Sequence, residues 1–508
     1  MKGGIVVLDF GSQLTQLIAR RLREMEVYSE LLPYNANLEK IKEHEPSGII
    51  LSGGPQSVHE DTSPKRDIKE LAEIAPILGI CYGMQLIASE YGGTTEKTEF
   101  REYGAQMVEW TETFGNTGKE QRVWMSHGDV VKTPPPGFEV VGMSKNGHPA
   151  ALKGDKMWAV QFHPEVTHTE NGSEILKSFV FDLCKCEHNW KPADIAEDLM
   201  SSIKKQVPED EHVIVGLSGG VDSTVAATLL TKALGRDRVH CVFVNNGLLR
   251  KNEYTEVLAR YQTMGLNVEG VDATDEFLNE LEGQFDPETK RKIIGRVFIE
   301  VFDSSVKKMT QNVKWLAQGT LYPDVIESVS PRGESVTIKS HHNVGGLPEK
   351  MNLKLVEPLR ELFKDEVRSL GAQIGIDHDA LWRHPFPGPG LGIRLLGPMN
   401  RKDLDVLREA DHIYISELKE QGLYDKIWQA FCVLLPIQTV GVQGDARTYD
   451  KVLALRAVTS HDGMTADWYP FTHEFLSHVS NRITNEVNGV NRVVYDVTSK
   501  PPGTIEWE

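Results

Sequence analysis

The sequence has little of what a secreted or membrane-spanning protein needs. Five cysteines in 508 residues are few and odd in number, so a disulfide framework is not expected and a reducing cytosol fits. No apolar run approaches the ~20 residues that span a bilayer, and no signal-peptide pattern opens the chain. Basic residues (55) are fewer than acidic ones (73), and a net charge of −18 argues against a general nucleic-acid-binding surface. We therefore expect a cytoplasmic protein that acts on small molecules.

The length and the pattern of apolar residues predict three domains. The apolar fraction of 40% and the charged fraction of 25% are ordinary for a globular protein. Strand-like runs alternate with helical periodicity in residues 1–188 and 207–384, which predicts two mostly parallel α/β sheets covered by helices. Residues 189–206 are charged, contain Pro192 and are expected to be a linker. Residues 385–508 predict a smaller α+β domain, compatible with dimerisation.

A glycine-rich turn is the most informative stretch. It follows an apolar run, Val213–Leu217, and leads into a helix-like segment. Such a strand, turn and helix start direct bare amides and the positive end of the helix dipole toward an anion, and Asp222 or Ser223 is expected to cap the helix. An ordinary strand–turn–helix corner is the alternative. The turn is not a Walker A loop. It resembles the pyrophosphate loop of enzymes that split ATP into AMP and pyrophosphate. Its residues are Ser218, Gly219, Gly220, Val221, Asp222, Ser223 and Thr224.

A second pattern, Gly-x-Cys-x-Gly around Cys81, follows the apolar run 76–80. It is the nucleophile-elbow pattern with cysteine in place of serine. The sharp turn would raise the sulfur above the sheet, and the helix N-terminus would favour the thiolate. The amides of Tyr82 and of the Gly53–Gly54 turn are expected to stabilise an oxyanion. A buried cysteine that only packs is the alternative.

A cysteine nucleophile needs a base and a group that orients the base. His163 and Glu165 stand two residues apart at a predicted strand end, so both project to the same side. Together with Gly53-Gly54-Pro55 and the Cys81 elbow, they resemble the class I glutamine amidotransferases. The resemblance implies that Cys81 attacks the side-chain amide of glutamine, forms a glutamyl thioester and releases ammonia.

Further residues at predicted strand ends and in one loop complete the central site. Val244 and Gly319 end two other strands and are expected beside ATP. Asp222, Asp324 and Glu327 are candidate Mg²⁺ ligands, since ATP chemistry needs the ion, although Asp324 and Glu327 fit a helix cap equally well. The Ser- and Gly-rich stretch 329–350 predicts a lid. Its candidate phosphate-facing residues are Lys339, His341, His342 and Asn343.

The order of these parts, with the C-terminal stretch 500–508, resembles the glutamine-hydrolysing GMP synthase family across nearly the whole chain. That resemblance implies that ATP adenylates xanthosine monophosphate (XMP) and that ammonia aminates it to GMP. From the C-terminal α+β domain we expect a homodimer. Asn245 departs from the aspartate expected of the family, which leaves the adenine side less defined. The implied XMP contacts are Arg291, Gln429, Arg492, Lys500, Ile505 and Glu506.

Three other functions stay open at this point. Another glutamine-dependent ATP-pyrophosphate ligase, such as one that makes NAD, would usually draw ammonia from a nitrilase-type domain rather than a Cys81 elbow. An enzyme that thiolates transfer RNA would need a basic face and a catalytic cysteine in the second half, where Cys241 and Cys432 are available. A nucleotide-sensing regulator without chemistry would not need Cys81, His163 and Glu165 together.

Overall fold

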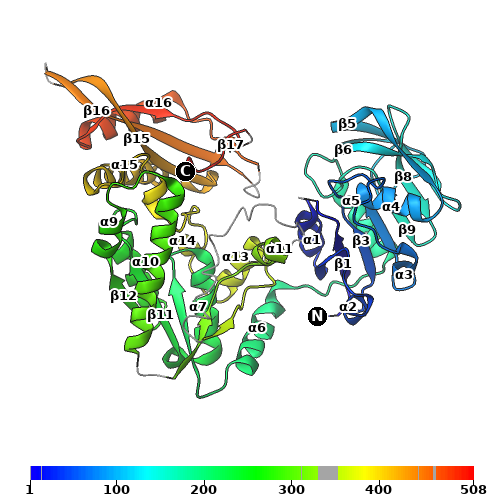
Figure 1. Cartoon of the computed structure of the whole chain (residues 1–508), viewed down its shortest axis with the longest axis horizontal. Coiled ribbons are helices and arrows are strands. Elements are labelled where there is room, and N and C mark those ends of the chain that lie inside the picture. Colours follow the sequence, from blue (N-terminus) through cyan, green and yellow to red (C-terminus); the bar gives the residue numbers. More distant parts are fainter. Residues whose placement is uncertain are drawn as a thin grey trace. The chain divides into compact units, whose positions relative to one another are not determined.

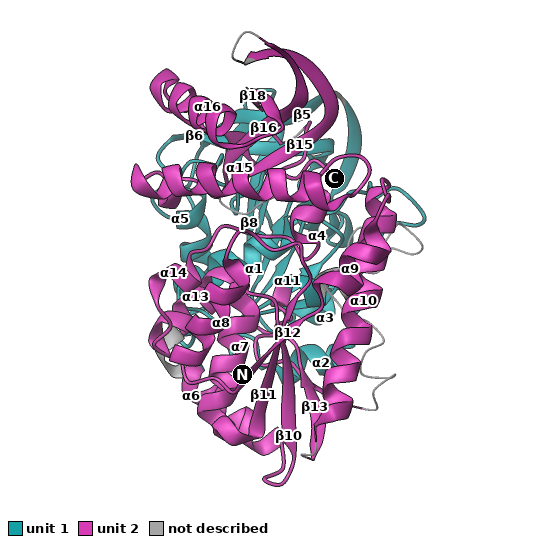
Figure 2. Ribbon diagram, turned by 90° about the vertical axis from the view of Figure 1, so that its left-hand side faces the viewer, with its two compact units in different colours: residues 1–195, 323–337 teal, residues 196–322, 338–508 magenta. Residues whose placement is uncertain are grey.

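The computed structural model describes residues 2–12, 14–309, 312–329, 353–443, 446–460, 465–500 and 502–508 (Figure 1). It divides into two compact units, which Figure 2 colours separately. The first holds residues 1–195 and a second stretch that begins at Pro323, and the second holds the rest. Within the described ranges, no helix is long and apolar enough to cross a membrane.

The first unit is built on one mixed sheet. Over the described residues its strand order is β2-β1-β3-β4-β9-β8-β7-β5-β6. The parallel strands β1–β4 confirm the expected βαβ rhythm. Their bounds, with β9, are β1 Ile5–Asp9, β2 Ser29–Pro33, β3 Gly48–Leu51, β4 Ile77–Ile80 and β9 Met157–Val160. The helices are α1 Thr15–Glu24, α2 Leu38–Glu43, α3 Ile68–Ala72, α4 Tyr82–Glu90 and α5 Gly172–Lys177, which continues as a π-helical turn, Ser178–Leu183.

Residues 94–160 depart from the alternation of strands and helices that the sequence predicts. They form the antiparallel strands β5 Thr94–Trp110, β6 Glu120–Thr133, β7 Glu139–Ser144 and β8 Pro149–Gly154, which precede β9. Buried and exposed side chains alternate along β6, as in an antiparallel sheet with one face in water. The runs that connect these strands are too short for crossover helices, so neighbouring strands pair directly.

The second unit contains the expected parallel sheet, with strand order β12-β11-β10-β13-β14. Helices α7 and α10 flank it (Figure 2). The strands are β10 His212–Leu217, β11 Val239–Asn245, β12 Val268–Asp272, β13 Val313–Ala317 and β14 Lys354–Val356. The helices of this region are α6 Pro192–Gln206, α7 Val221–Leu234, α8 Glu253–Thr263, α9 Thr274–Leu281, α10 Pro287–Lys308, α13 Lys364–Gln373 and α14 His378–Leu381. Helix α11, Tyr322–Val329, belongs to the first unit from Pro323 onward.

Helix α6 occupies most of the stretch predicted to be a linker. Pro192 begins this helix rather than breaking it. The first helical position tolerates proline because its missing N–H would have no partner inside the helix.

The C-terminal part is the expected α+β module. Its long hairpin, β15 with β16, is prominent in Figure 1. Strand β17 pairs with β16 in antiparallel fashion, and β18 pairs with it in parallel. The bounds are α15 Arg401–Glu420, β15 Gln429–Gln443, β16 Ala446–Thr459, β17 Asp467–Trp468, α16 His473–Glu486 and β18 Val490–Tyr495.

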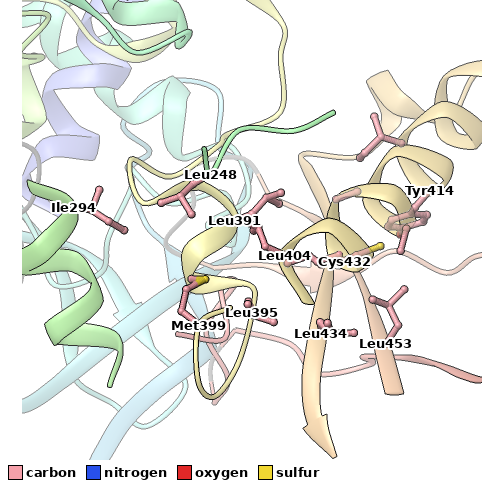
Figure 3. Packing of buried hydrophobic residues seen from close by; sticks show 14 of the residues in the cluster. Leu248, Ile294, Leu391, Leu395, Met399, Leu404, Tyr414, Cys432, Leu434 and Leu453 are labelled. Atoms are coloured by element: carbon pink, nitrogen blue, oxygen red, sulfur yellow. The ribbon is translucent and has the colours of Figure 1, made fainter. Parts of the chain in front are cut away.

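One hydrophobic core continues across the predicted domain boundary at 384/385. It joins Ile294 of α10 and Leu248, which follows β11, to Leu391, Leu404 and Leu434 of the C-terminal module (Figure 3). The Pro- and Gly-rich stretch after residue 385 includes a short 3₁₀ helix, Gly390–Ile393. The amide of Leu391 donates to the carbonyl of Leu248 at 2.8 Å. The central and C-terminal modules therefore share side chains in a single core.

Candidate functional site

Cys81 occupies a strained turn between β4 and α4. Its φ is +52° and its ψ is −101°, a conformation that residues with a Cβ rarely adopt and that marks functional sites. A Cβ on Gly79 would lie 2.7 Å from the backbone of Gly83, and one on Gly83 would lie 2.6 Å from the carbonyl oxygen of Leu51. The two glycines of the elbow pattern are therefore required by close packing around the cysteine.

His163 and Glu165 form a buried pair just after β9. His163 Nδ1 lies 2.7 Å from Glu165 Oε1. Burial disfavours the imidazolium, but the negative charge of Glu165 and the hydrogen bond to Cys81 outweigh it and hold the pKa of His163 well above its usual range. Glu165 therefore fixes the tautomer, with Nδ1–H donating to the carboxylate and Nε2 left for the sulfur. The structure brings the three predicted catalytic residues together.

The predicted oxyanion donors border the same site. Tyr82 is the first residue of α4, where a backbone N–H has no partner inside the helix. Gly53 lies against the imidazole, because a Cβ there would stand 3.1 Å from His163 Cε1. Both positions suit donors to an oxygen beside Cys81.

Two residues that the sequence did not single out also face the sulfur. Gln161 Nε2 lies 3.7 Å from Cys81 Sγ, and the carbonyl oxygen of Ser126 lies 3.8 Å from it. The Gln161 amide group also contacts Gln85, whose Nε2 donates to the carbonyl of Asp129 at 2.8 Å. Alternation along the chain offered one signal, since Gln161 stands two residues before His163. No such signal marked Ser126, which belongs to β6.

The glycine loop follows β10 and precedes α7, as predicted. Gly219 has φ +77°, a conformation that favours glycine. The predicted capping role of Asp222 or Ser223 is wrong, because the N-cap is Gly220 and no side chain caps the helix. The Ser223 hydroxyl instead accepts the amide of Ser218 at 3.2 Å and donates to the carbonyl of Gly220. The Ser223 hydroxyl therefore connects the two ends of the turn through hydrogen bonds to its backbone.

Charged and backbone groups gather beside this loop. Lys364 Nζ lies 2.9 and 2.6 Å from the two carboxylate oxygens of Asp222, a contact that sequence spacing did not reveal. A Cβ on Gly319 would stand 3.1 Å from the backbone of Asp222, so the structure brings Gly319 to the start of α7. Val244 is buried near the end of β11, and the next residue, Asn245, contacts Asp272.

Some predicted residues cannot be compared with the structure. The lid residues Lys339, His341, His342 and Asn343 lie outside the described residues, as does the side chain of Glu327. Asp324 lies in the first turn of α11. Among the described residues, no group of three or more His, Cys, Asp or Glu side chains could hold a metal by itself. Asp222 remains a carboxylate within the loop, and Mg²⁺ commonly takes one or two carboxylates together with phosphate oxygens.

The C-terminal tail brings three of the six predicted XMP contacts together. Glu506 accepts from Gln429 Nε2 at 2.6 Å and from Arg394 at 2.8 and 3.2 Å, and its neighbour Ile505 is buried. Arg394 is fully buried, and the sequence did not identify it as a candidate site residue. Its only signal was a charge inside an apolar run.

The other three predicted contacts lie on separate elements. Arg291 belongs to α10, next to Lys290, which pairs with Glu508 at 3.0 Å. Arg492 is exposed on β18. The backbone of Lys500 bonds in both directions to Ala466. These positions are compatible with a role at the tail.

Similarity to known proteins extends over nearly the whole chain. Residues 6–183 match the class-I glutamine amidotransferase family, 195–296 the NAD synthase family, and 416–507 the GMP synthase C terminal domain. A GMP synthase (glutamine-hydrolyzing) of Bdellovibrio bacteriovorus is 64% identical over 99% of this chain and 100% of its own length. Those of Cytophaga hutchinsonii and Chlorobaculum tepidum are each 54% identical over 99% of both chains.

The chain belongs to the glutamine-hydrolysing GMP synthase family. The family resemblance predicted from the motifs is thereby confirmed. The match of the central region to NAD synthase is consistent with a shared type of ATP-binding domain. The relatives that match over their full length are GMP synthases, which favours membership of that family over an NAD-forming ligase.

Proposed function

We propose that this protein makes GMP from XMP, using ammonia from glutamine and cleaving ATP to AMP and pyrophosphate. The observation that carries the proposal is the strained Cys81 elbow with its Glu165-backed His163, in a chain that also holds a phosphate-binding type of glycine loop and belongs to this family. One site releases nitrogen, and the other activates an oxygen as a leaving group. The protein is then a carbon–nitrogen ligase with glutamine as the amido donor.

At the first site, Cys81 Sγ attacks the side-chain carbonyl carbon of glutamine after His163 takes its proton. The amides of Tyr82 and Gly53 stabilise the oxyanion. His163 returns the proton to the leaving nitrogen, which departs as ammonia, and water then hydrolyses the thioester to glutamate. The position of Gln161 Nε2 supports a role in stabilising negative charge on the sulfur.

At the second site, the loop 218–224 binds the pyrophosphate part of ATP, with Val244 and Gly319 completing the pocket. Lys364 is placed to contact the phosphates, since it already reaches Asp222 beside the loop. Mg²⁺, held by Asp222 together with phosphate oxygens and with Asp324 and Glu327 as further candidates, would neutralise charge on the phosphates. Lys339, His341, His342 and Asn343 are proposed to close over them.

The acceptor is proposed to bind near the C-terminal tail. Gln429 and Glu506 suit the polar edge of a purine, and Ile505 packs beside them. Arg291, Arg492 and Lys500 suit the 5′-phosphate, because cations bind phosphate directly. The C2 oxygen of XMP attacks the α-phosphorus of ATP and expels pyrophosphate. Ammonia then attacks C2 and expels AMP.

We further propose a cytoplasmic homodimer formed through the C-terminal module. The long hairpin of β15 and β16 carries exposed apolar side chains, which a second copy would cover. They are Ile437, Val440, Val442 and Tyr449. Sedimentation or light scattering of the full chain, with Val442→Glu as the test variant, decides this point: we expect a dimer that the variant weakens.

The test of the function is direct. Purified protein is incubated with ATP, Mg²⁺, glutamine and XMP, and the products are separated and quantified. We expect GMP, AMP, pyrophosphate and glutamate in equal amounts. Formation of ADP and phosphate, or amination of another acceptor in preference to XMP, would contradict the proposal.

A further inference from the structure

A chain of alternating charges connects the glycine loop to the C-terminal module. It runs through Arg383, Glu253, Arg250 and Asp411. These residues lie two positions after α14, at the start of α8, in the turn before α8 and in the middle of α15, respectively. The side chains of Glu253 and Asp411 are 7% and 1% exposed. The mechanism proposed above uses none of the four.

Arg383 binds the backbone of the glycine loop. Its Nη1 donates to the carbonyl oxygen of Gly219 at 2.7 Å, and a Cβ on Gly219 would lie 3.4 Å from the same nitrogen. In a trans peptide unit, the carbonyl and the following N–H point in opposite directions. By holding the Gly219 carbonyl, Arg383 directs the Gly220 amide to the opposite side, where it meets the Ser218 hydroxyl at 3.3 Å.

Glu253 connects this arginine to the next. One oxygen pairs with Arg383 Nη2, and the other accepts the amide of Arg250 at 2.9 Å. Burial alone would raise the pKa of Glu253, but Arg383 and Arg250 outweigh it and lower the pKa. Glu253 is therefore an anion between two cations, and loss of its charge would leave Arg383 without this carboxylate partner.

Arg250 carries the chain into the C-terminal module. Its Nε lies 3.1 Å from Asp411 Oδ2, and its Nη2 donates to the carbonyl of Ala430 at 3.1 Å. The other oxygen of Asp411 accepts the amide of Cys432 at 3.1 Å. Ala430 follows Gln429, which binds Glu506. This series of charged residues thus ends beside the residues proposed to recognise the acceptor.

We propose that Arg383 is a positioning residue for the pyrophosphate loop, and that Glu253, Arg250 and Asp411 hold it in register with the acceptor-binding strand. The inference rests on the proposed function, since it names what orients the ATP loop of that site. Alternating charges at this degree of burial permit few other arrangements, so a displacement at one end is transmitted to the other. The orientation of the Gly219–Gly220 peptide in the loop then depends on all four charged residues.

The test measures AMP formation by the full-length protein with XMP, Mg²⁺ and ammonium, with ATP as the varied substrate. Arg383→Lys keeps the charge but cannot bind the Gly219 carbonyl and Glu253 together in the same geometry. We expect its KM for ATP to rise about tenfold or more, the range for losing a charged hydrogen bond, while glutamine hydrolysis is unchanged. Arg238→Lys is the matched control: Arg238 is also partly buried and holds backbone carbonyls, but it precedes β11, at the amino edge of the sheet.

Coupling is tested with Asp411→Asn, which removes the charge at the far end of the chain. We expect this variant also to raise the KM for ATP, and the double variant with Arg383→Lys to cost clearly less than the product of the single effects. A KM for ATP within twofold of wild type in Arg383→Lys would overturn the positioning role. Independent effects in the double variant would overturn the coupling.

If Arg383→Lys or Asp411→Asn does not fold, a third variant still tests the proposal. Glu253→Gln keeps the shape of the side chain and removes its charge, and the same rise in the KM for ATP is expected from it. If the wild-type protein forms no AMP with XMP, the proposed function fails. If wild type does so and these variants bind ATP normally, only the positioning inference fails.

Discussion

His163 Nδ1 lies 2.7 Å from Glu165 Oε1, with side chains that are 5% and 1% exposed. In so buried a pair the low local dielectric strengthens the hydrogen bond between the carboxylate and the imidazole. The histidine is thereby held in one tautomer, facing a cysteine whose backbone is itself held at φ +52°. This pair accounts for several expected properties of the amidotransferase site.

Removal of the nucleophile should separate the two activities. We expect Cys81→Ala to lower glutamine-dependent GMP synthesis by a factor of about 10³ or more, while synthesis from added ammonium at high pH continues. Product formation with each nitrogen source measures this. Cys186→Ala, at a partly exposed cysteine in the same unit, is the control and should retain both. Loss of both activities in Cys81→Ala would contradict the division of labour.

Removal of the charge on Glu165 should shift the pH dependence of glutamine hydrolysis. After burial, which lowers the pKa of His163, the charge of Glu165 is the main influence that raises it. In Glu165→Gln the imidazolium therefore loses its proton at lower pH, and the alkaline limb of kcat/KM for glutamine should move to lower pH. We also expect a 10- to 100-fold lower rate. The profile is measured from pH 6 to 10.

The matched control for that shift is Glu102→Gln. Glu102 is another glutamate of this unit that is buried against a histidine, with Oε2 3.1 Å from His127 Nε2. It does not touch His163. An alkaline limb that moves equally in both variants would mean that the effect of Glu165 is not specific.

A methyl group on the elbow glycine should be costly. Gly83 lies in α4, where alanine is intrinsically favoured by up to ~1 kcal/mol, yet its Cβ would lie 2.6 Å from a backbone oxygen. We expect Gly83→Ala to lower the free energy of unfolding by about 1–3 kcal/mol and to reduce glutaminase activity. Gly295→Ala is the control, because it is also helical and nothing lies within 4 Å of its Cβ. Denaturant titration should show a lower free energy of unfolding for Gly83→Ala and a higher one for Gly295→Ala.

Asp222 should be needed only for the ATP half of the reaction. We expect Asp222→Ala to abolish conversion of ATP to AMP, because it removes the carboxylate beside the loop and frees Lys364, while glutamine hydrolysis continues. Pyrophosphate release and glutamate release are measured separately. Asp237→Ala, at an exposed turn before β11, should affect neither. Pyrophosphate release that persists in Asp222→Ala would refute the assignment.

His384 should make the second unit sensitive to acid. Burial lowers its pKa to about 4; Nδ1 accepts the Ala430 amide, and Nε2 lies 2.8 Å from the Tyr424 carbonyl. Between the ordinary value of ~6.5 and 4 the unfolded chain binds the extra proton, so stability falls as pH falls through this range, by up to about 3 kcal/mol. Unfolding of wild type and His384→Gln is compared at pH 7 and 4.5. The variant should lose less stability on acidification, and exposed His378→Gln should behave as wild type.

The sequence by itself determined the local parts of both sites. Cys81 lies in a five-residue pattern that permits little besides a strand, a sharp turn and a helix. His163 and Glu165 share a side because alternate residues of an extended chain do so. The same holds for the loop 218–224, where glycines and a preceding apolar run are enough to predict the turn. The error over its cap arose because Ser223 can bond the loop backbone as readily as a helix end.

Only the tertiary structure decided which distant groups meet these parts. Ser126 and Gln161 meet Cys81, Lys364 meets Asp222, and Arg383 meets Gly219, across 45 to 164 residues. Such contacts depend on which strands are neighbours and in what register they pair, as when β4 lies between β3 and β9. A periodic pattern states which side of an element is buried, but it does not identify the element that covers it.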